Sequence, residues 1–158
     1  MTNKLQTAAV AFLIFLSTLC SAQSLSETTS WMHNYAAANS NLPLLDGTYI
    51  RMEVDFVGCQ VTQVVLPARD APYTEYYSLA DLDPTSVVAA GSVYFDTTNS
   101  EQRIYFAMPD GTRVALGSVS ESIIGVAPSN GPGNSYDQRF ANALKHAILL
   151  CGGKPSTF

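Results

Sequence analysis

The sequence is poor in basic residues, histidine, cysteine and tryptophan. Its 158 residues include eight lysines and arginines, two histidines, three cysteines and one tryptophan, against thirteen acidic residues. The formal net charge is −5, and the cationic side chains are scattered along the chain. A basic surface for nucleic acid or an anionic membrane is therefore not expected. The histidines have no cysteine or carboxylate neighbours at a metal-binding spacing, so we expect neither a metal nor another cofactor.

Motifs for common catalytic chemistry are also missing. The G-x-S-x-G and G-x-x-x-x-G-K-[ST] patterns do not occur. His33 and His146 lie on expected helices and are predicted to be surface side chains rather than catalytic groups. Asp81 and Asp83 offer too few oxygen ligands for a calcium loop and are predicted to cap a turn. These absences favour a protein that is not an enzyme.

Residues 1–22 have the pattern of an export signal. Lys4 precedes an apolar run at residues 8–19 that is too short to span a bilayer comfortably, and small residues follow it up to Ala22. We predict a signal peptide over residues 1–22, with Gln23 as the first mature residue, and a periplasmic or secreted protein. No later apolar run reaches transmembrane length.

Cys20 offers an alternative to simple cleavage, because a lipid can be attached to a cysteine at the end of a signal. Small residues normally precede such a cysteine, whereas Leu19 stands there in this chain. Cleavage after Ala22 is therefore the favoured interpretation.

Cleavage would leave Cys59 and Cys151 as the two cysteines of the mature chain. Two cysteines in an oxidising compartment most simply form one disulfide, and two buried free thiols are the alternative. The two positions are 92 residues apart. The chain-entropy account of such a long loop gives a stabilisation of about 4–5 kcal/mol.

The mature residues, 23–158, are predicted to form one domain that begins and ends with a helix. Ser24 and Glu27 have capping-box spacing at the start of a helix over residues 24–38. A second helix is expected from Ser135 to Cys151, with a C-cap at Gly152-Gly153. The apolar stripe of this second helix comprises Phe140, Ala143, Leu144, Ala147, Ile148 and Cys151.

Between the helices the apolar residues recur with a period of two, which indicates β-strands. Residues 50–57 and 61–66 predict a hairpin with Cys59 near its tip. A second hairpin, with Ile104, Phe106 and Met108 facing inward, turns at residues 109–111 and returns through residues 114–116. Further short strands are expected at residues 76–79, 86–90, 92–96 and 122–126, and loops at 67–75 and 127–134.

This order of elements predicts an α+β fold. The C-terminal helix has the apolar stripe needed to cover an antiparallel sheet or a partly open β-barrel, as in pleckstrin-homology-like folds. A flatter sheet with both helices on one face is the alternative.

Two segments resemble a family of uncharacterised small exported bacterial proteins. They are residues 77–84 with Val87 (YSLADLDP…V), and residues 140–148 followed by 150–154 (FANALKHAI…LCGGK). With the Gly58-Cys59 turn, they are similar to chains whose sheet is closed by a C-terminal helix. The resemblance implies a bacterial envelope protein and supports a Cys59–Cys151 pair, and it implies no activity.

We therefore expect an exported, non-enzymatic binding or envelope accessory protein, whose partner is a protein or a small molecule. The candidate binding surface comprises the loops at 67–75 and 127–134, with Arg69, Tyr73 and Asn130. One alternative is a small-ligand or lipid carrier with an apolar cavity. Another is a hydrolase that uses dispersed carboxylates, for which Glu53 and Asp55 share a strand face.

Overall fold

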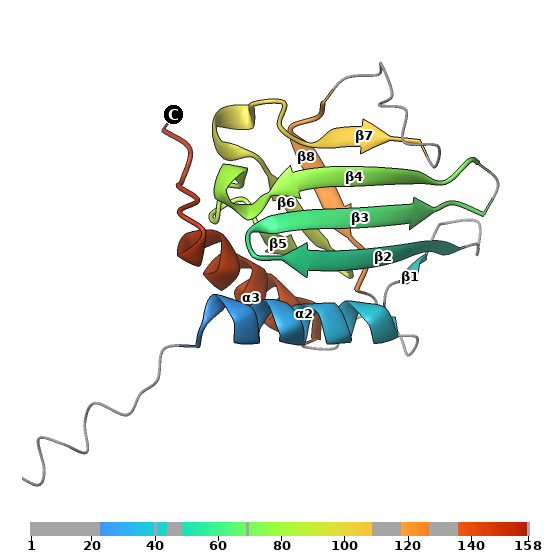
Figure 1. Cartoon of the computed structure of the whole chain (residues 1–158), viewed down its shortest axis with the longest axis horizontal. Helices are drawn as coiled ribbons and strands as arrows, with labels where there is room; N and C mark the ends of the chain where they lie inside the picture. Colours follow the sequence, from blue (N-terminus) through green and yellow to red (C-terminus); the bar gives the residue numbers. More distant parts are fainter. Residues whose placement is uncertain are drawn as a thin grey trace, which may run out of the picture.

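In the part of the chain that the structure describes, two α-helices and two antiparallel sheets are present, which confirms the predicted α+β class (Figure 1). The computed structural model describes residues 23–39, 41–43, 49–68, 70–108, 118–126 and 136–157. The helices are α2 (Leu25–Asn39) and α3 (Tyr136–Leu150). The predicted signal peptide and the loop at 127–134 lie outside the described residues.

The larger sheet has the strand order β1-β2-β3-β4-β7, and the smaller sheet has the order β5-β6-β8. The strands are β1 (Asn41–Pro43), β2 (Tyr49–Val57), β3 (Gln60–Leu66), β4 (Tyr73–Ser78), β5 (Val88–Ala89), β6 (Val93–Asp96), β7 (Tyr105–Ala107) and β8 (Glu121–Ile124). The 3₁₀ helices of the described ranges, η2 (Leu79–Asp81) and η3 (Thr98–Ser100), lie between strands. Within the described part of the chain the strands form two separate sheets and do not close a barrel.

The hairpin of β2 and β3 forms as predicted. Val57 pairs with Gln60, which leaves Gly58 and Cys59 as a two-residue turn. Gly58 has a φ of 59°, a left-handed conformation that glycine adopts without strain. The turn therefore presents Cys59 at the end of the hairpin. Along β2, Met52 and Val54 are buried while Glu53 is exposed, as the alternation predicts.

Strand β4 begins earlier than the sequence suggests. Residues 73–75 were predicted to belong to a polar loop, but they pair with β3 and β7. The side chains of Glu75 and Tyr77 point into the interior while Tyr76 is exposed. The prediction was wrong because a glutamate in a strand normally marks a solvent face, whereas Glu75 finds hydrogen-bond partners inside.

Strand β7 also differs from its prediction. Ile104 is fully buried, but Phe106 and Met108 are only half-buried, and Ala107 is buried on the opposite face. The described ladder of β7 is with β4, and Ile104 forms an isolated bridge with Val119. The predicted turn at 109–111 and the returning strand at 114–116 lie outside the described residues.

Both helices follow their sequence signals closely. The Ser24 and Glu27 side chains form the capping box, with the Ser24 backbone N–H donating to Glu27 at 2.8 Å and the Glu27 N–H donating to the Ser24 hydroxyl at 3.2 Å. Helix α3 ends at Leu150, and the chain then turns at Gly152, whose φ is 88°, with the Gly153 N–H donating to the Ile148 carbonyl. Ser135, the expected N-cap, is not among the described residues.

The smaller sheet lies behind the larger one, and α2 packs beside β2 with α3 behind it (Figure 1). Helix α2 contacts β2 and α3, while α3 contacts β5, β6 and η2. One hydrophobic core joins all of these elements. Its largest fully buried side chains include Phe95, Phe140, Met32, Leu79, Leu82, Ile104, Ile124, Leu144 and Ile148.

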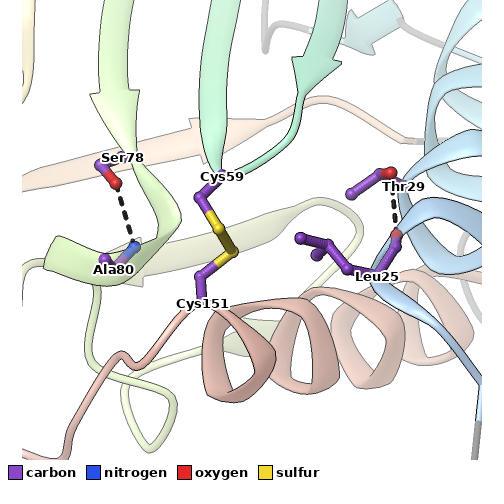
Figure 2. The surroundings of a disulfide bond; sticks show 6 residues. All are labelled: Leu25, Thr29, Cys59, Ser78, Ala80 and Cys151. Atoms are coloured by element: carbon purple, nitrogen blue, oxygen red, sulfur yellow. Dashed lines mark hydrogen bonds between the residues drawn. A yellow bond between two sulfur atoms is a disulfide. The ribbon is translucent and has the colours of Figure 1, made fainter.

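A disulfide joins Cys59 and Cys151, with their Cα atoms 5.7 Å apart. Figure 2 shows the bond linking the β2–β3 turn to the end of α3, with the Leu25 side chain of α2 pointing toward it. The Cys59 carbonyl also accepts a 2.8 Å hydrogen bond from the Leu79 N–H. The turn, η2 and the end of α3 are thus held together at one point.

Replacing both cysteines with serine in a protein of residues 23–158 is expected to lower the melting temperature. Without the disulfide the unfolded chain is no longer constrained by a covalent loop, so the free energy of unfolding should fall by about 2–5 kcal/mol. The far-UV circular dichroism spectrum should change little, because the core is unaltered. Calorimetry under oxidising conditions measures the effect. Reductant should lower the wild-type value to that of the variant and leave the variant unchanged, and equal melting temperatures before reduction would contradict the prediction.

Candidate functional site

A surface pocket between α2 and α3 is the strongest candidate for a binding site. It has a volume of about 430 Å³, within the range of small-molecule sites. We call it the helix pocket, and its described lining residues are Gln23, Trp31, Arg139, Asn142, Ala143 and His146. Positions 139, 142, 143 and 146 recur at helical spacing, so the face of α3 that adjoins its buried stripe supplies one wall of the pocket.

Trp31 joins the pocket to the core. Its ring stacks on Tyr35 with centroids 5.3 Å apart, and it also contacts Phe140 at 6.2 Å. Trp31 packs against the core, but it remains half-buried and also lines the helix pocket.

Arg139 is positioned by Trp31. Its guanidinium carbon lies 5.8 Å from the centre of the Trp31 ring, within the range of a cation–π contact. Among the described residues no carboxylate pairs with Arg139. The nearest acidic residue in sequence, Asp137, instead accepts a hydrogen bond from the Gly91 N–H at 3.1 Å. The guanidinium is therefore available to a ligand.

Two further polar side chains of the helix pocket have defined orientations. The Asn142 amide oxygen accepts a 3.1 Å hydrogen bond from Gln138, which leaves the Asn142 NH₂ group as a donor. The His146 Nε2 atom lies 3.0 Å from the Gln23 carbonyl oxygen. Because a carbonyl can only accept, Nε2 carries the proton in this contact.

A second pocket, of about 280 Å³, lies beside η2 and the chain end and is lined by Asp81, Glu101, Arg103 and Lys154 among others. Arg103 donates to Asp81 at 3.0 Å and through its Nε atom to Glu101 at 2.6 Å. These carboxylates, Glu101 foremost, raise the pKa of Arg103 further. The cation of this pocket is thus already neutralised within the protein, which makes the pocket a weaker ligand site.

A polar cluster is buried between the two sheets. The Gln63 amide donates to the Ile123 carbonyl at 2.8 Å and lies 3.4 Å from Glu75, and the Ser122 hydroxyl also donates to Glu75. Tyr77 reaches the Gln63 amide oxygen at 3.5 Å. Burial raises the pKa of Glu75, although the Ser122 hydrogen bond opposes the shift. The cluster joins β3 and β4 to β8, so it fixes how the sheets meet.

This buried cluster does not have the arrangement of a glycoside hydrolase site, which requires two carboxylates across a cleft. Glu75 is its one carboxylate among the described residues. Glu53 and Asp55, the pair noted in the sequence, are both exposed and bound elsewhere. Glu53 pairs with Arg51 at 2.9 Å, and Asp55 lies 3.3 Å from the His33 imidazole.

Asp83 holds the C-terminal segment, as an extension of its predicted turn-capping role. One carboxylate oxygen accepts from the Thr85 N–H at 2.7 Å and the other from the Ser156 N–H at 2.9 Å. Burial alone would raise the pKa of Asp83, but the hydrogen bonds from Thr85 and Ser156 lower it to about 2. The segment is further held by hydrogen bonds between Asn99 and Thr157.

The sequence-predicted binding surface is only partly visible. Tyr73 is half-buried in β4, where its ring packs edge-on against Phe106 at 5.7 Å, and burial raises its pKa. Arg69 and Asn130 lie outside the described residues. The sequence did not single out Arg139, Asn142 or Gln23. The spacing of polar residues beside the apolar stripe of α3 is the signal that could have identified the first two.

Comparison of this chain with protein-family models, with curated proteins and with solved structures finds no match. Within the described ranges no helix is long and apolar enough to cross a membrane. The same part of the chain contains no cluster of three or more histidine, cysteine, aspartate or glutamate side chains that could hold a metal ion. The geometry of the helix pocket is therefore the main guide to function.

Replacing Asp83 with asparagine is expected to destabilise the protein by about 1–2 kcal/mol at neutral pH, because the amide cannot accept from both N–H groups equally well. The folded-state pKa of about 2 lies below the unfolded value of about 3.9, so the carboxylate contributes stability above pH 4 and loses it as the pH falls toward 2. The melting temperatures of wild type and Asp83→Asn, measured from pH 7 down to pH 2, should therefore differ at pH 7 and become equal as the pH approaches 2. Asp70→Asn, at an exposed loop position, is the matched control. A constant difference at all pH values would contradict the assignment.

Proposed function

We propose that this chain is an exported, non-enzymatic binding protein whose ligand site is the helix pocket. The observation that carries the proposal is a pocket of small-molecule size lined by an aromatic ring and by an arginine that has no carboxylate partner among the described residues. Tryptophan and arginine are the side chains most enriched where binding energy is concentrated. The proposal moves the site from the loops predicted by sequence to the α2–α3 surface.

The wall of the helix pocket that α3 provides is well fixed. The opposite side of α3 packs Phe140, Leu144 and Ile148 into the core, and all three are fully buried. The disulfide ties the end of the same helix to the β2–β3 turn. A preformed wall of this kind reduces the entropy lost when a ligand binds.

A lipid or small-ligand carrier would need an enclosed apolar cavity instead. In the described region the space between the sheets is occupied by buried side chains, including Phe95 and Ile124, and by the polar cluster around Glu75. We therefore favour a surface site over an internal one.

Export is supported by two observations of different kinds. The pattern of residues 1–22 is typical of a signal peptide, and the disulfide between Cys59 and Cys151 is typical of an oxidising compartment.

Expression of the full sequence in a bacterial host should yield an exported protein whose intact mass begins at Gln23. Both thiols should resist alkylation until reductant is added, because they form the disulfide. Intact mass spectrometry with and without reduction measures both properties. A lipid on Cys20 would instead make the protein a membrane-anchored lipoprotein, and an uncleaved chain with free thiols would contradict export.

Ligand binding to the helix pocket should change the fluorescence of Trp31, which is the only tryptophan of the chain. We expect a screen of small neutral, cationic and anionic molecules against residues 23–158 to give a saturable emission change and a higher melting temperature. Ala143→Phe fills the pocket and should abolish the response. Ala80→Phe, in the second pocket, is the control and should retain it.

Asn142→Ala provides a further variant at an exposed position, should the larger side chain at 143 disturb folding. A response that survives both pocket variants, or a screen without any saturable response, would contradict the proposed site.

A further inference from the structure

We propose that the ligand of the helix pocket is a small organic anion whose acidic group is held by Arg139, with Asn142 as a second donor. This inference rests on the proposed function and adds the chemical class of the ligand. Its basis is the imbalance between hydrogen-bond donors and acceptors in the pocket.

The polar groups of the pocket that remain available are mainly donors. A guanidinium has only N–H groups to offer, and the Asn142 oxygen is already occupied by Gln138. The His146 proton on Nε2 in turn satisfies the Gln23 carbonyl. None of the described lining residues is acidic. A ligand that brings acceptor oxygens and negative charge therefore complements the site.

Arg139 differs from the other arginines that the structure describes. Arg51 pairs with Glu53 at 2.9 Å, and Arg103 pairs with Asp81 and Glu101. Arg139 has no such partner within the described ranges, although acidic residues outnumber basic ones by thirteen to eight. An exposed cation beside an aromatic ring, with no carboxylate partner among the described residues, offers a local place for an external anion.

The N–H groups of Arg139 make no hydrogen bond to another residue that the structure describes, although the guanidinium carbon lies 5.8 Å from the centre of the Trp31 ring. The N–H bonds of a guanidinium lie in its plane and point outward. Those in-plane groups can then bind the two oxygens of a carboxylate or of a phosphate monoester side by side. Trp31 thus orients the cation without consuming its hydrogen bonds.

The size of the pocket indicates an organic anion rather than an inorganic ion. Its volume of about 430 Å³ greatly exceeds the space that a lone anion fills. Trp31 and Ala143 supply apolar surface beside the donors. The acidic group would lie at Arg139 and Asn142, with the apolar body of the ligand against these two side chains.

The test uses two probes of nearly equal shape that differ in charge, cyclohexanecarboxylate and its uncharged amide, cyclohexanecarboxamide. Each is titrated into residues 23–158 at constant ionic strength while Trp31 emission is recorded. We expect the carboxylate to bind at least about tenfold more tightly than the amide, because this ratio of affinities corresponds to the free energy of one charge-assisted hydrogen bond. Cyclohexyl phosphate is titrated in parallel, and its affinity relative to the carboxylate distinguishes the two sources of the anionic group.

Three arginine variants make the result specific. Arg139→Gln should weaken carboxylate binding about tenfold or more and weaken amide binding much less, because only the carboxylate loses a charge-assisted hydrogen bond. Arg139→Lys, which keeps the charge but not the paired N–H groups, should recover part of the loss. Arg103→Gln, which removes a cation that is already neutralised, should have no effect.

Equal affinities for the acid and the amide, unchanged in Arg139→Gln, would overturn the anion proposal. The proposal would also be overturned if neither acid gave a saturable response at concentrations up to about 10 mM, which corresponds to a very weak affinity. In either case the screen with neutral and cationic compounds and the Ala143→Phe variant decides separately whether the helix pocket is a ligand site.

Discussion

The structure depends on the way α3 is fixed against both sheets. Its buried face carries Phe140, Leu144 and Ile148 into the core, and the disulfide from Cys151 to Cys59 anchors its last turn to the β2–β3 hairpin. Rotation of α3 about its axis would require these side chains to leave the core. The orientation of its outer residues, including Arg139, is therefore set by packing on the opposite side of the same helix.

The parts of the fold that were predictable from the sequence are those encoded by neighbouring residues. The Ser24 capping box, the apolar stripe of α3 and the Gly58-Cys59 turn each depend on contacts within a few positions. The cysteine pair was predictable for another reason, since removal of the predicted signal would leave only two cysteines. Local patterns were thus sufficient to predict both helices and the first hairpin, and the number of cysteines was sufficient to predict the disulfide.

The candidate site was not predictable in the same way, because it is formed by residues from distant parts of the chain. Trp31 and Arg139 meet only once α2 and α3 pack together. Glu75 shows the same limit: its burial is understandable only when Ser122 and Gln63 are known to lie beside it. In the sequence, a polar residue whose hydrogen-bond partners lie in other elements looks the same as an exposed polar residue. The alternation of buried and exposed residues along β4 could therefore not be recognised.

The position of Gln23 has a practical consequence. Its carbonyl accepts from His146, and the residue lines the helix pocket, so any group attached to its nitrogen begins beside the proposed ligand site. An affinity tag fused directly before this residue would compete with a ligand for space, and a positively charged tag would alter the local field as well. Purified protein with an unblocked start at Gln23 is therefore the appropriate material for crystallisation with ligands.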